Sequence, residues 1–391
     1  MVAKSMEFGL SQEQRLMQST IEDIGEDYGL EYWREKDQDE EFPHEVWETL
    51  SEAGFAGTII PQEYGGQGYG MLELVLLSMA LARSGGGVSG ANLLTSGVIA
   101  PTAIRDHGTE AQKERWLPEM ADGAFISIAL TEPNAGLDTA GIEMRAEEDG
   151  NGFVLNGTKT WITGATQSEY LITLARTAPK SEGARHEGIS LFLVPSEAAG
   201  LEMNKIDKLS MRCLGSYEVV YDDVHVSADS LIGDRGKGFF HVLNSLNTER
   251  LNWAAIPLGA GELALSLAVD YANERESFGK KIGANQGVQF PLAECKAELE
   301  TAKLMLYKAA WLHDNGKDCA MEANASKLMG ARAGFNAADQ ALQTHGGMGF
   351  ADEYHVERLY RDIRLAKVAP VSDELVKAYI GEHVLDLPPS Y

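Results

Sequence analysis

The sequence of 391 residues predicts an α+β fold: an N-terminal all-α domain, a middle β-sheet domain and a C-terminal antiparallel four-helix bundle. Apolar residues recur at helical spacing before about residue 123 and after about residue 236, whereas the segment between them has shorter, strand-like periodicity. We therefore place the domains at residues 1–123, 124–235 and 236–391. With 44% hydrophobic residues, the chain is long enough to bury the core of several packed modules.

The helical parts have clear local signals. Ser11 followed by Gln14 is typical of a helix start, and residues 71–82 predict a densely apolar, buried helix that a run of three glycines ends. In the C-terminal part, long amphipathic stretches with short connections indicate an antiparallel bundle. We expect its helices at residues 239–274, 286–315, 319–345 and 372–384.

The middle part contains the strongest local signal of the chain. Asn156-Gly157 suits the positive φ angles of a type I′ turn, so we expect a hairpin between strands at residues 153–155 and 158–163. Further strands are expected at residues 170–175, 189–194 and 217–221.

The charge balance excludes some classes of partner. Asp and Glu number 59 against 33 Lys and Arg, which gives a formal net charge of −26. Such a field repels nucleic acid and anionic lipid. Two interpretations of the acidic composition stay open. One is a generously solvated mesophilic surface, and the other is a halophilic protein of a high-salt cytoplasm, where ions screen the self-repulsion. The spread of the acidic residues along the chain favours the second.

The cysteines and the remaining motifs exclude further classes. Cys213, Cys295 and Cys319 are odd in number and widely scattered, so we expect no disulfide framework, no metal site and a cytoplasmic location. No apolar run reaches the roughly 18 residues of a membrane span. The glycines of residues 65–70 do not follow a strand, which favours a turn over a dinucleotide-binding loop.

Two segments of the middle part suit a planar ligand. After Leu130, Thr131 and the backbone amides of a Pro- and Gly-containing turn can face a ligand, although an ordinary turn has the same pattern. Trp161 and Thr163 combine a flat aromatic surface with a hydroxyl at the end of a strand. The alternative for Trp161 is packing in the core of the sheet.

Two segments of the C-terminal part suit a phosphate-containing ligand. Arg275 comes late in a helix, just before Phe278 and a glycine, and fits a diphosphate beside an apolar wall. Residues 343–350 end a helix in glycines that allow a close backbone approach to a ligand. Either segment is equally compatible with a simple helix end.

Glu249 is the candidate catalytic carboxylate. It lies in an otherwise apolar helical stretch, one turn before Trp253. Partial desolvation on a core-facing stripe favours protonation of a carboxylate, which suits a general base near neutral pH. An exposed ion pair with Arg250 is the alternative on spacing alone.

Taken together, the motifs resemble those of the acyl-CoA dehydrogenase family over essentially the whole chain. In family order and at family spacing they are LTEPNAGLD, NGTKTWIT, MRCLGSYEVVYDDVHV, LNTERLNWAA, ERESFGKKI, QTHGGMGF and RLYRDIR. The resemblance implies the three-domain fold given above, FAD as cofactor and a homotetramer. It also implies that an acyl-CoA thioester is oxidised to the trans-2-enoyl-CoA and that an electron-transfer flavoprotein accepts the electrons.

The resemblance further implies roles for individual residues. The flavin would be contacted by Leu130, Thr131, Trp161 and Thr163. The diphosphate and adenosine part of FAD would be held across a subunit interface by Arg275, Phe278 and Gln286. The cofactor site would be completed by Gln343, Gly347, Ser372 and Glu374. The acyl-CoA channel would be lined by Phe240, Asn247 and Arg250.

The chain departs from the family pattern at three points. Most members carry the base after the RLYRD motif, where this chain has Pro370, which offers neither a carboxylate nor an N–H donor for the thioester oxygen. Isovaleryl-CoA and long-chain members place the base on the earlier helix, at the position of Glu249. Leu137 replaces the serine usually found after the TEP turn, and Ala369 replaces a bulky tyrosine, which favours branched or longer acyl groups.

Acyl-CoA dehydrogenation with Glu249 as the base is therefore the leading prediction. Enoyl-CoA reduction and a flavin-dependent oxygenase reaction are alternatives within the same family. A catalytically silent protein that binds FAD and CoA is an alternative of a different class.

Overall fold

The structure, a computed structural model, describes residues 9–180 and 184–389, with the backbone alone at 244–246. The chain divides into two compact units, described here one after the other. The helical unit consists of Met1–Glu35, Gly70–Asn92 and Arg250–Tyr391, and the sheet unit consists of Lys36–Tyr69 and Leu93–Glu249. Helices precede and follow the strands along the chain, which confirms the predicted α+β fold class. The domain boundaries expected near residues 123 and 235 stay a prediction.

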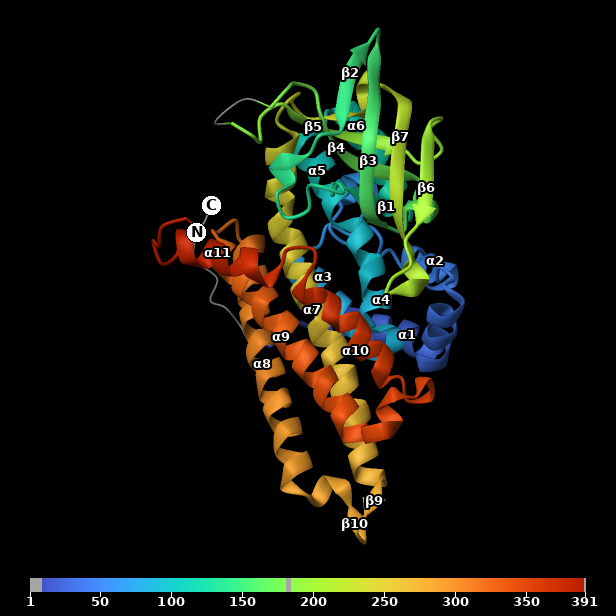
Figure 1. Cartoon of the computed structure of the whole chain (residues 1–391), viewed down its shortest axis with the longest axis vertical. Coiled ribbons are helices and arrows are strands. Elements are labelled where there is room, and N and C mark those ends of the chain that lie inside the picture. The colour runs from blue at the N-terminus through green and yellow to red at the C-terminus, as the bar shows by residue number, and fades with distance from the viewer. Residues whose placement is uncertain (1–8, 181–183, 390–391) are drawn as a thin grey trace. The chain divides into compact units, whose positions relative to one another are not determined.

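The helical unit contains the long helices that the periodicity predicted (Figure 1). The helices that belong to it wholly or in part are α1 (Gln12–Asp39), α3 (Met71–Leu81), α4 (Gly87–Asn92), α7 (Gly238–Glu274), α8 (Gln286–Asp314), α9 (Ala320–His345), α10 (Val356–Arg364) and α11 (Asp373–His383). A short hairpin of β9 (Glu276–Ser277) and β10 (Lys280–Lys281) joins α7 to α8. Helices α1 and α7 each continue into the sheet unit.

Small residues allow α9 to pack closely on α7. A Cβ atom added at Gly330 would lie 2.7 Å from the carbonyl oxygen of Ala254, and one added at Gly334 would lie 2.1 Å from that of Pro257. Both distances are too short for any side chain, so the two backbones approach each other at these glycines. Helix α3 is buried on nearly all sides, as its apolar composition predicted, and a π-helical turn at Ala82–Gly86 follows it.

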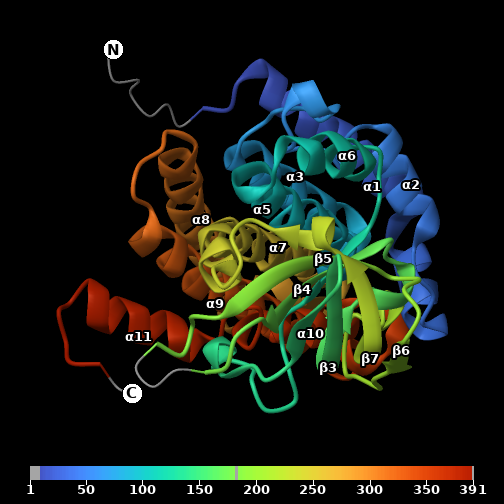
Figure 2. The ribbon, with the colours of Figure 1, turned by 90° about the horizontal axis from the view of Figure 1, so that it is seen from above.

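The sheet unit is built around an eight-stranded mixed sheet. Seven strands have the order β6-β7-β3-β2-β4-β5-β8, and β1 pairs in parallel with β4. Figure 2 shows β3, β7 and β6 following one another across one end of the sheet. The strands are β1 (Ile126–Ala129), β2 (Arg145–Asp149), β3 (Gly152–Thr163), β4 (Tyr170–Arg176), β5 (Ile189–Pro195), β6 (Leu201–Lys205), β7 (Ser216–Ser227) and β8 (Leu231–Ile232). Helices of the same unit are α2 (His44–Glu52), α5 (Ile99–His107) and α6 (Glu110–Ala121).

Both faces of the central strands are buried. Successive side chains of a strand point to opposite faces of the sheet, and on β4 each face packs into an apolar cluster of its own. On β4, Ile172 and Leu174 pack into one apolar cluster together with residues of α5 and α6. Leu171 and Ala175 point the other way and pack with Phe153 and other residues of β3, β5 and β7. The strands β4, β5 and β7 confirm three of the sequence predictions.

The hairpin predicted at Asn156-Gly157 is wrong, because β3 runs unbroken from Gly152 to Thr163. The turn between β2 and β3 lies earlier, at Gly150 and Asn151, where Gly150 has φ 60°. Asn156 instead lies at an irregularity in the pairing of β3 with β7. Its side-chain amide donates to Asp223 at 3.0 Å and accepts from the Asp223 N–H at 2.9 Å. These hydrogen bonds across the sheet stabilise the Asn-Gly pair within a strand.

Two helical stretches among the described residues are long and apolar enough to span a membrane. They are Met71–His107 and α7, with 78% and 83% of their most apolar windows buried. Core helices pass the same test, so this finding is weak evidence for a membrane span.

Candidate active site

The turn after β1 is anchored by a buried ion pair. The Lys159 side chain is fully buried on β3, and its Nζ donates to the Leu130 carbonyl oxygen at 3.0 Å and to Glu132 Oε1 at 2.9 Å. Glu132, 7% exposed, also accepts the backbone N–H groups of Glu143 at 2.7 Å and Met144 at 3.0 Å. The carboxylate of Glu132 therefore has three donors, and the turn is tied both to β3 and to the segment before β2.

Burial and charge act in opposite directions on Lys159. Desolvation lowers the pKa of the Lys159 ammonium to about 8, although the neighbouring Glu132 carboxylate opposes this shift. The lysine is thus mostly protonated at neutral pH. Sequence reasoning missed this residue, although the period-two alternation from Phe153 and Leu155 places Lys159 on the buried side of the strand.

Trp161 lies at the end of β3 and is 55% exposed. Its φ of 63° coincides with a shift in the register of β3 against β7 between Lys159 and Ile162. This bulge buries both Lys159 and Ile162 and turns the indole toward the outside, which a regular strand would not do. The alternative of a tryptophan packed in the sheet core is therefore wrong.

Hydrogen bonds bring the ends of β1 and β3 together. Thr160 N–H donates to the Thr131 carbonyl oxygen at 2.9 Å, and Ser127 Oγ donates to the Thr163 carbonyl oxygen at 2.8 Å. The Thr163 hydroxyl lies 3.1 Å from the Ser216 hydroxyl. These hydrogen bonds thus bring together the four predicted flavin contacts, where the end of β3 meets the segment that follows β1. The four residues are Leu130, Thr131, Trp161 and Thr163.

Glu249 lies on α7 and is 6% exposed, so the exposed position that was the alternative on spacing alone is wrong. Thr248 beside it is 2% exposed, and Trp253 one turn later is 6% exposed. Earlier on the same helix, the Phe240 ring is 38% exposed and lies edge-on to His186, with ring centroids 5.1 Å apart. Asn247 and Arg250, the other predicted substrate contacts, are half-buried.

The predicted diphosphate residues surround the β9–β10 hairpin of the helical unit. Arg275 is exposed, and its carbonyl oxygen accepts the Ile282 N–H at 2.9 Å, which closes the hairpin. Phe278 at the tip is fully exposed, with φ 50°. Gln286 is exposed at the first turn of α8. The exposed ring of Phe278 and the exposed side chain of Arg275 are therefore both accessible to a ligand or a second chain.

The remaining predicted cofactor residues lie at two helix ends of the helical unit. Gln343 is exposed in the last turn of α9, and nothing lies within 4 Å of a Cβ added at Gly347 just after it. The Ser372 hydroxyl accepts the Leu375 N–H at 3.3 Å and caps α11, whereas Glu374 is exposed in the first turn. The cap gives Ser372 a structural role that the sequence did not predict.

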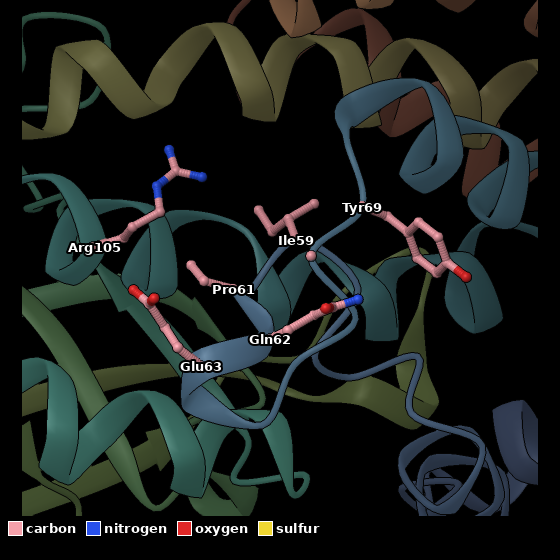
Figure 3. Close-up of a pocket in the computed structure, with 7 residues that line it drawn as sticks. Ile59, Pro61, Gln62, Glu63, Tyr69 and Arg105 are labelled. Atoms are coloured by element: carbon pink, nitrogen blue, oxygen red, sulfur yellow. The ribbon is translucent and has the colours of Figure 1, made fainter.

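A surface hollow of about 500 Å³ lies elsewhere in the sheet unit (Figure 3). It is lined by Ile59, Pro61, Gln62, Glu63, Gly68, Tyr69 and Arg105, none of which is a predicted site residue. The Arg105 guanidinium is already bonded to Asp106 at 2.7 and 3.1 Å. Within the described part of the chain, no group of three His, Cys, Asp or Glu side chains could hold a metal ion.

Family models match three consecutive segments of the chain. They are the N-terminal domain of acyl-CoA dehydrogenase at residues 11–124, the middle domain at 127–224 and the C-terminal domain at 236–385.

Individual relatives match almost the whole length. An acyl-CoA dehydrogenase, fadE12, of Mycobacterium bovis is 37% identical over 384 residues, which cover 97% of this chain and 98% of the relative. An acryloyl-CoA reductase (NADH) of Anaerotignum propionicum is 33% identical, covering 98% and 97%. Among solved structures, butyryl-CoA dehydrogenase from Megasphaera elsdenii has a TM-score of 0.92 at 30% identity, covering 97% and 100%. An FAD complex of PigA has a TM-score of 0.91 at 26% identity, covering 98% and 100%.

Proposed function

Because this chain belongs to the acyl-CoA dehydrogenase family, we propose that it oxidises an acyl-CoA thioester to the trans-2-enoyl-CoA with Glu249 as the base. The family makes the chain an oxidoreductase with FAD as cofactor. The single observation that carries the assignment of the base is the burial of Glu249 on α7, in a chain where Pro370 occupies the more usual position of the base.

The side chains proposed to hold FAD have properties that fit this cofactor. Trp161 has an exposed indole that suits a planar ring, and Thr131 and Thr163 have hydroxyl groups that suit its polar edge. In the helical unit, exposed Arg275 suits a diphosphate, and Gly347 has open space around it. Phe278, Gln286, Gln343, Ser372 and Glu374 complete the proposed set. We propose that part of this set acts on the FAD of a neighbouring subunit in a homotetramer.

The proposed chemistry needs a base that is poorly solvated. Glu249 takes the α-proton of the thioester, whose acidity is low, so the carboxylate must be held close to that carbon and away from water. Buried neighbours such as Thr248 and Trp253 support this role. When bound, FAD accepts the hydride that leaves the β-carbon. We propose that Phe240, Asn247 and Arg250 line the acyl-CoA channel and hold the substrate beside Glu249.

The proposal also covers the kind of acyl group that is oxidised and the protein that accepts the electrons. We propose an electron-transfer flavoprotein as the acceptor, and a branched or longer acyl group because Ala369 is small. The cytoplasmic location and the adaptation to high salt also belong to the proposal, with the net charge of −26 as support for the latter.

Enoyl-CoA reduction is the second candidate function, because one close relative is named an acryloyl-CoA reductase. The same carboxylate would then give a proton to the α-carbon. Turnover of acyl-CoA with an artificial electron acceptor, compared with turnover of enoyl-CoA and NADH, separates the two directions.

Glu249→Gln tests the proposed base, because glutamine keeps the size of the side chain but cannot take the proton. We expect flavin reduction by acyl-CoA in a single turnover to slow by about 10³-fold, the order that loss of a general base costs. FAD content should stay unchanged. The matched control is Glu262→Gln on the same helix, because the Glu262 side chain is only 8% exposed, pairs with Lys303 at 2.6 Å and has no place in the proposed chemistry. Near wild-type reduction by the Glu249 variant would assign the base to another residue.

A further inference from the structure

The buried pair of Lys159 and Glu132 does more than join two strands, because Lys159 also holds a backbone carbonyl. Its Nζ lies 3.0 Å from the carbonyl oxygen of Leu130, the first of the two residues, Leu130 and Thr131, that the proposed function assigns to the flavin. The next residue of β3, Thr160, donates its N–H to the following carbonyl, that of Thr131, at 2.9 Å. Consecutive residues of β3 therefore fix the carbonyl groups of both Leu130 and Thr131.

Fixing a carbonyl also fixes the N–H on the other side of the same peptide unit. The peptide bond is planar and trans, so the Thr131 N–H points in the direction opposite to the Leu130 C=O. Because that C=O points at the buried Lys159, the Thr131 N–H points away from the buried pair. Rotation of this peptide plane would break the Lys159 contact and leave a buried ammonium with one acceptor fewer.

We propose that Lys159 is a positioning residue that aims the Thr131 N–H at the flavin of FAD. The inference rests on the proposed function, which assigns Leu130 and Thr131 to flavin contact. The lysine itself does not touch the cofactor and acts only through the Leu130 peptide. A cationic donor on the carbonyl also polarises the peptide and makes its N–H a stronger hydrogen-bond donor.

The geometry explains why a charged residue occupies this fully buried position of β3. Glu132 already accepts two backbone N–H groups, from Glu143 and Met144, and a buried carboxylate needs a cation as well. A lysine on β3 satisfies that need and still has protons left for the Leu130 carbonyl. Stability alone requires only that the two charges be present together or absent together. Positioning of the Thr131 N–H requires the lysine specifically, which separates the two roles experimentally.

The test compares variants of the holoenzyme by two measurements: the rate at which FAD is released on dilution and the visible absorption of the bound flavin. Glu132→Gln keeps the Lys159 contact with Leu130 and should release FAD at nearly the wild-type rate. Adding Lys159→Met to that variant leaves a neutral pair of similar size. We expect it to melt no lower than Glu132→Gln, because it no longer buries an unpaired ammonium. It should release FAD about tenfold faster than Glu132→Gln, the factor that corresponds to one hydrogen bond, and shift the flavin absorption band.

Arg176→Met is the matched control. Arg176 is 6% exposed in the same unit and donates to the Ile142 carbonyl at 2.7 Å and to three other carbonyls, but not to Leu130 or Thr131. It should lower the melting temperature without accelerating FAD release. Equal release from Arg176→Met and from the double variant, or unchanged release from the double variant, would overturn the inference.

A further variant separates failure of this inference from failure of the proposed function. Trp161→Ala removes an exposed side chain that the proposed function places against the flavin. If Trp161→Ala releases FAD at the wild-type rate, the flavin site itself is wrong and the inference falls with it. If only Trp161→Ala accelerates the release, the flavin site stands and the role of Lys159 is refuted.

Discussion

Asp314 caps a helix that lies more than two hundred residues earlier in the chain. At the end of α8, its Oδ1 accepts the Met71 N–H at 2.7 Å and its Oδ2 accepts the Leu72 N–H at 2.9 Å. These are the first two N–H groups of α3, which have no partner within the helix. The negative charge also lies at the positive end of the helix dipole. We predict that Asp314→Ala destabilises the helical unit measurably.

The magnitude follows from the two hydrogen bonds and their exposure. A hydrogen bond to a charged group contributes about 1.5–3 kcal/mol when shielded from water. The Asp314 side chain is 22% exposed, and the Leu72 contact lies at the surface, so water replaces part of each lost bond. We therefore expect a loss of about 2 kcal/mol of unfolding free energy for Asp314→Ala, and about 1 kcal/mol for Asp314→Asn, which keeps one acceptor oxygen.

Scanning calorimetry measures the effect as a fall in melting temperature. For a unit of roughly 200 residues, a loss of about 2 kcal/mol corresponds to about 4–8 °C. Asp270→Ala on α7 is the control, because it removes the same charge from an exposed position. Equal melting temperatures for the Asp314 and Asp270 variants would refute the capping argument, since only Asp314 accepts the N–H groups of α3.

Two further predictions concern salt and pH. With a net charge of −26, the surface repels itself at low ionic strength, so molar KCl should raise the melting temperature by several degrees; identical melting curves in dilute buffer and in molar KCl would contradict adaptation to high salt. The pKa of Lys159 is lowered from 10.5 to about 8 by burial, so the unfolded chain binds more protons than the folded chain between these values. Lys159 therefore makes the unfolding free energy rise as pH increases from about 8 to 10.5. Denaturant titrations across that pH range should show this rise in the wild-type protein and not in Lys159→Met.

Features that depend on neighbouring residues could be predicted from the sequence. Ser11 and Gln14 form reciprocal hydrogen bonds of 2.9 and 3.0 Å at the start of α1, as the spacing indicated. The apolar composition of residues 71–82 predicted a buried helix, and the periodicity located the long C-terminal helices. The ordered motifs also predicted the family, and with it FAD, through their resemblance to those of acyl-CoA dehydrogenases.

Features that depend on residues far apart in the chain were decided only by the tertiary structure. Asn156-Gly157 has the composition of a tight turn, but its hydrogen bonds with Asp223 on β7 keep it within a strand. Lys159 is buried because Glu132 and the Leu130 carbonyl surround it, and Trp161 is exposed because the register of β3 against β7 shifts beside it. A turn or strand propensity amounts to about 1 kcal/mol or less, and a few well-placed hydrogen bonds across a sheet outweigh it. The sequence by itself therefore determined the order of the elements and the family, while long-range hydrogen bonding and burial decided which side chains face the core and which are exposed.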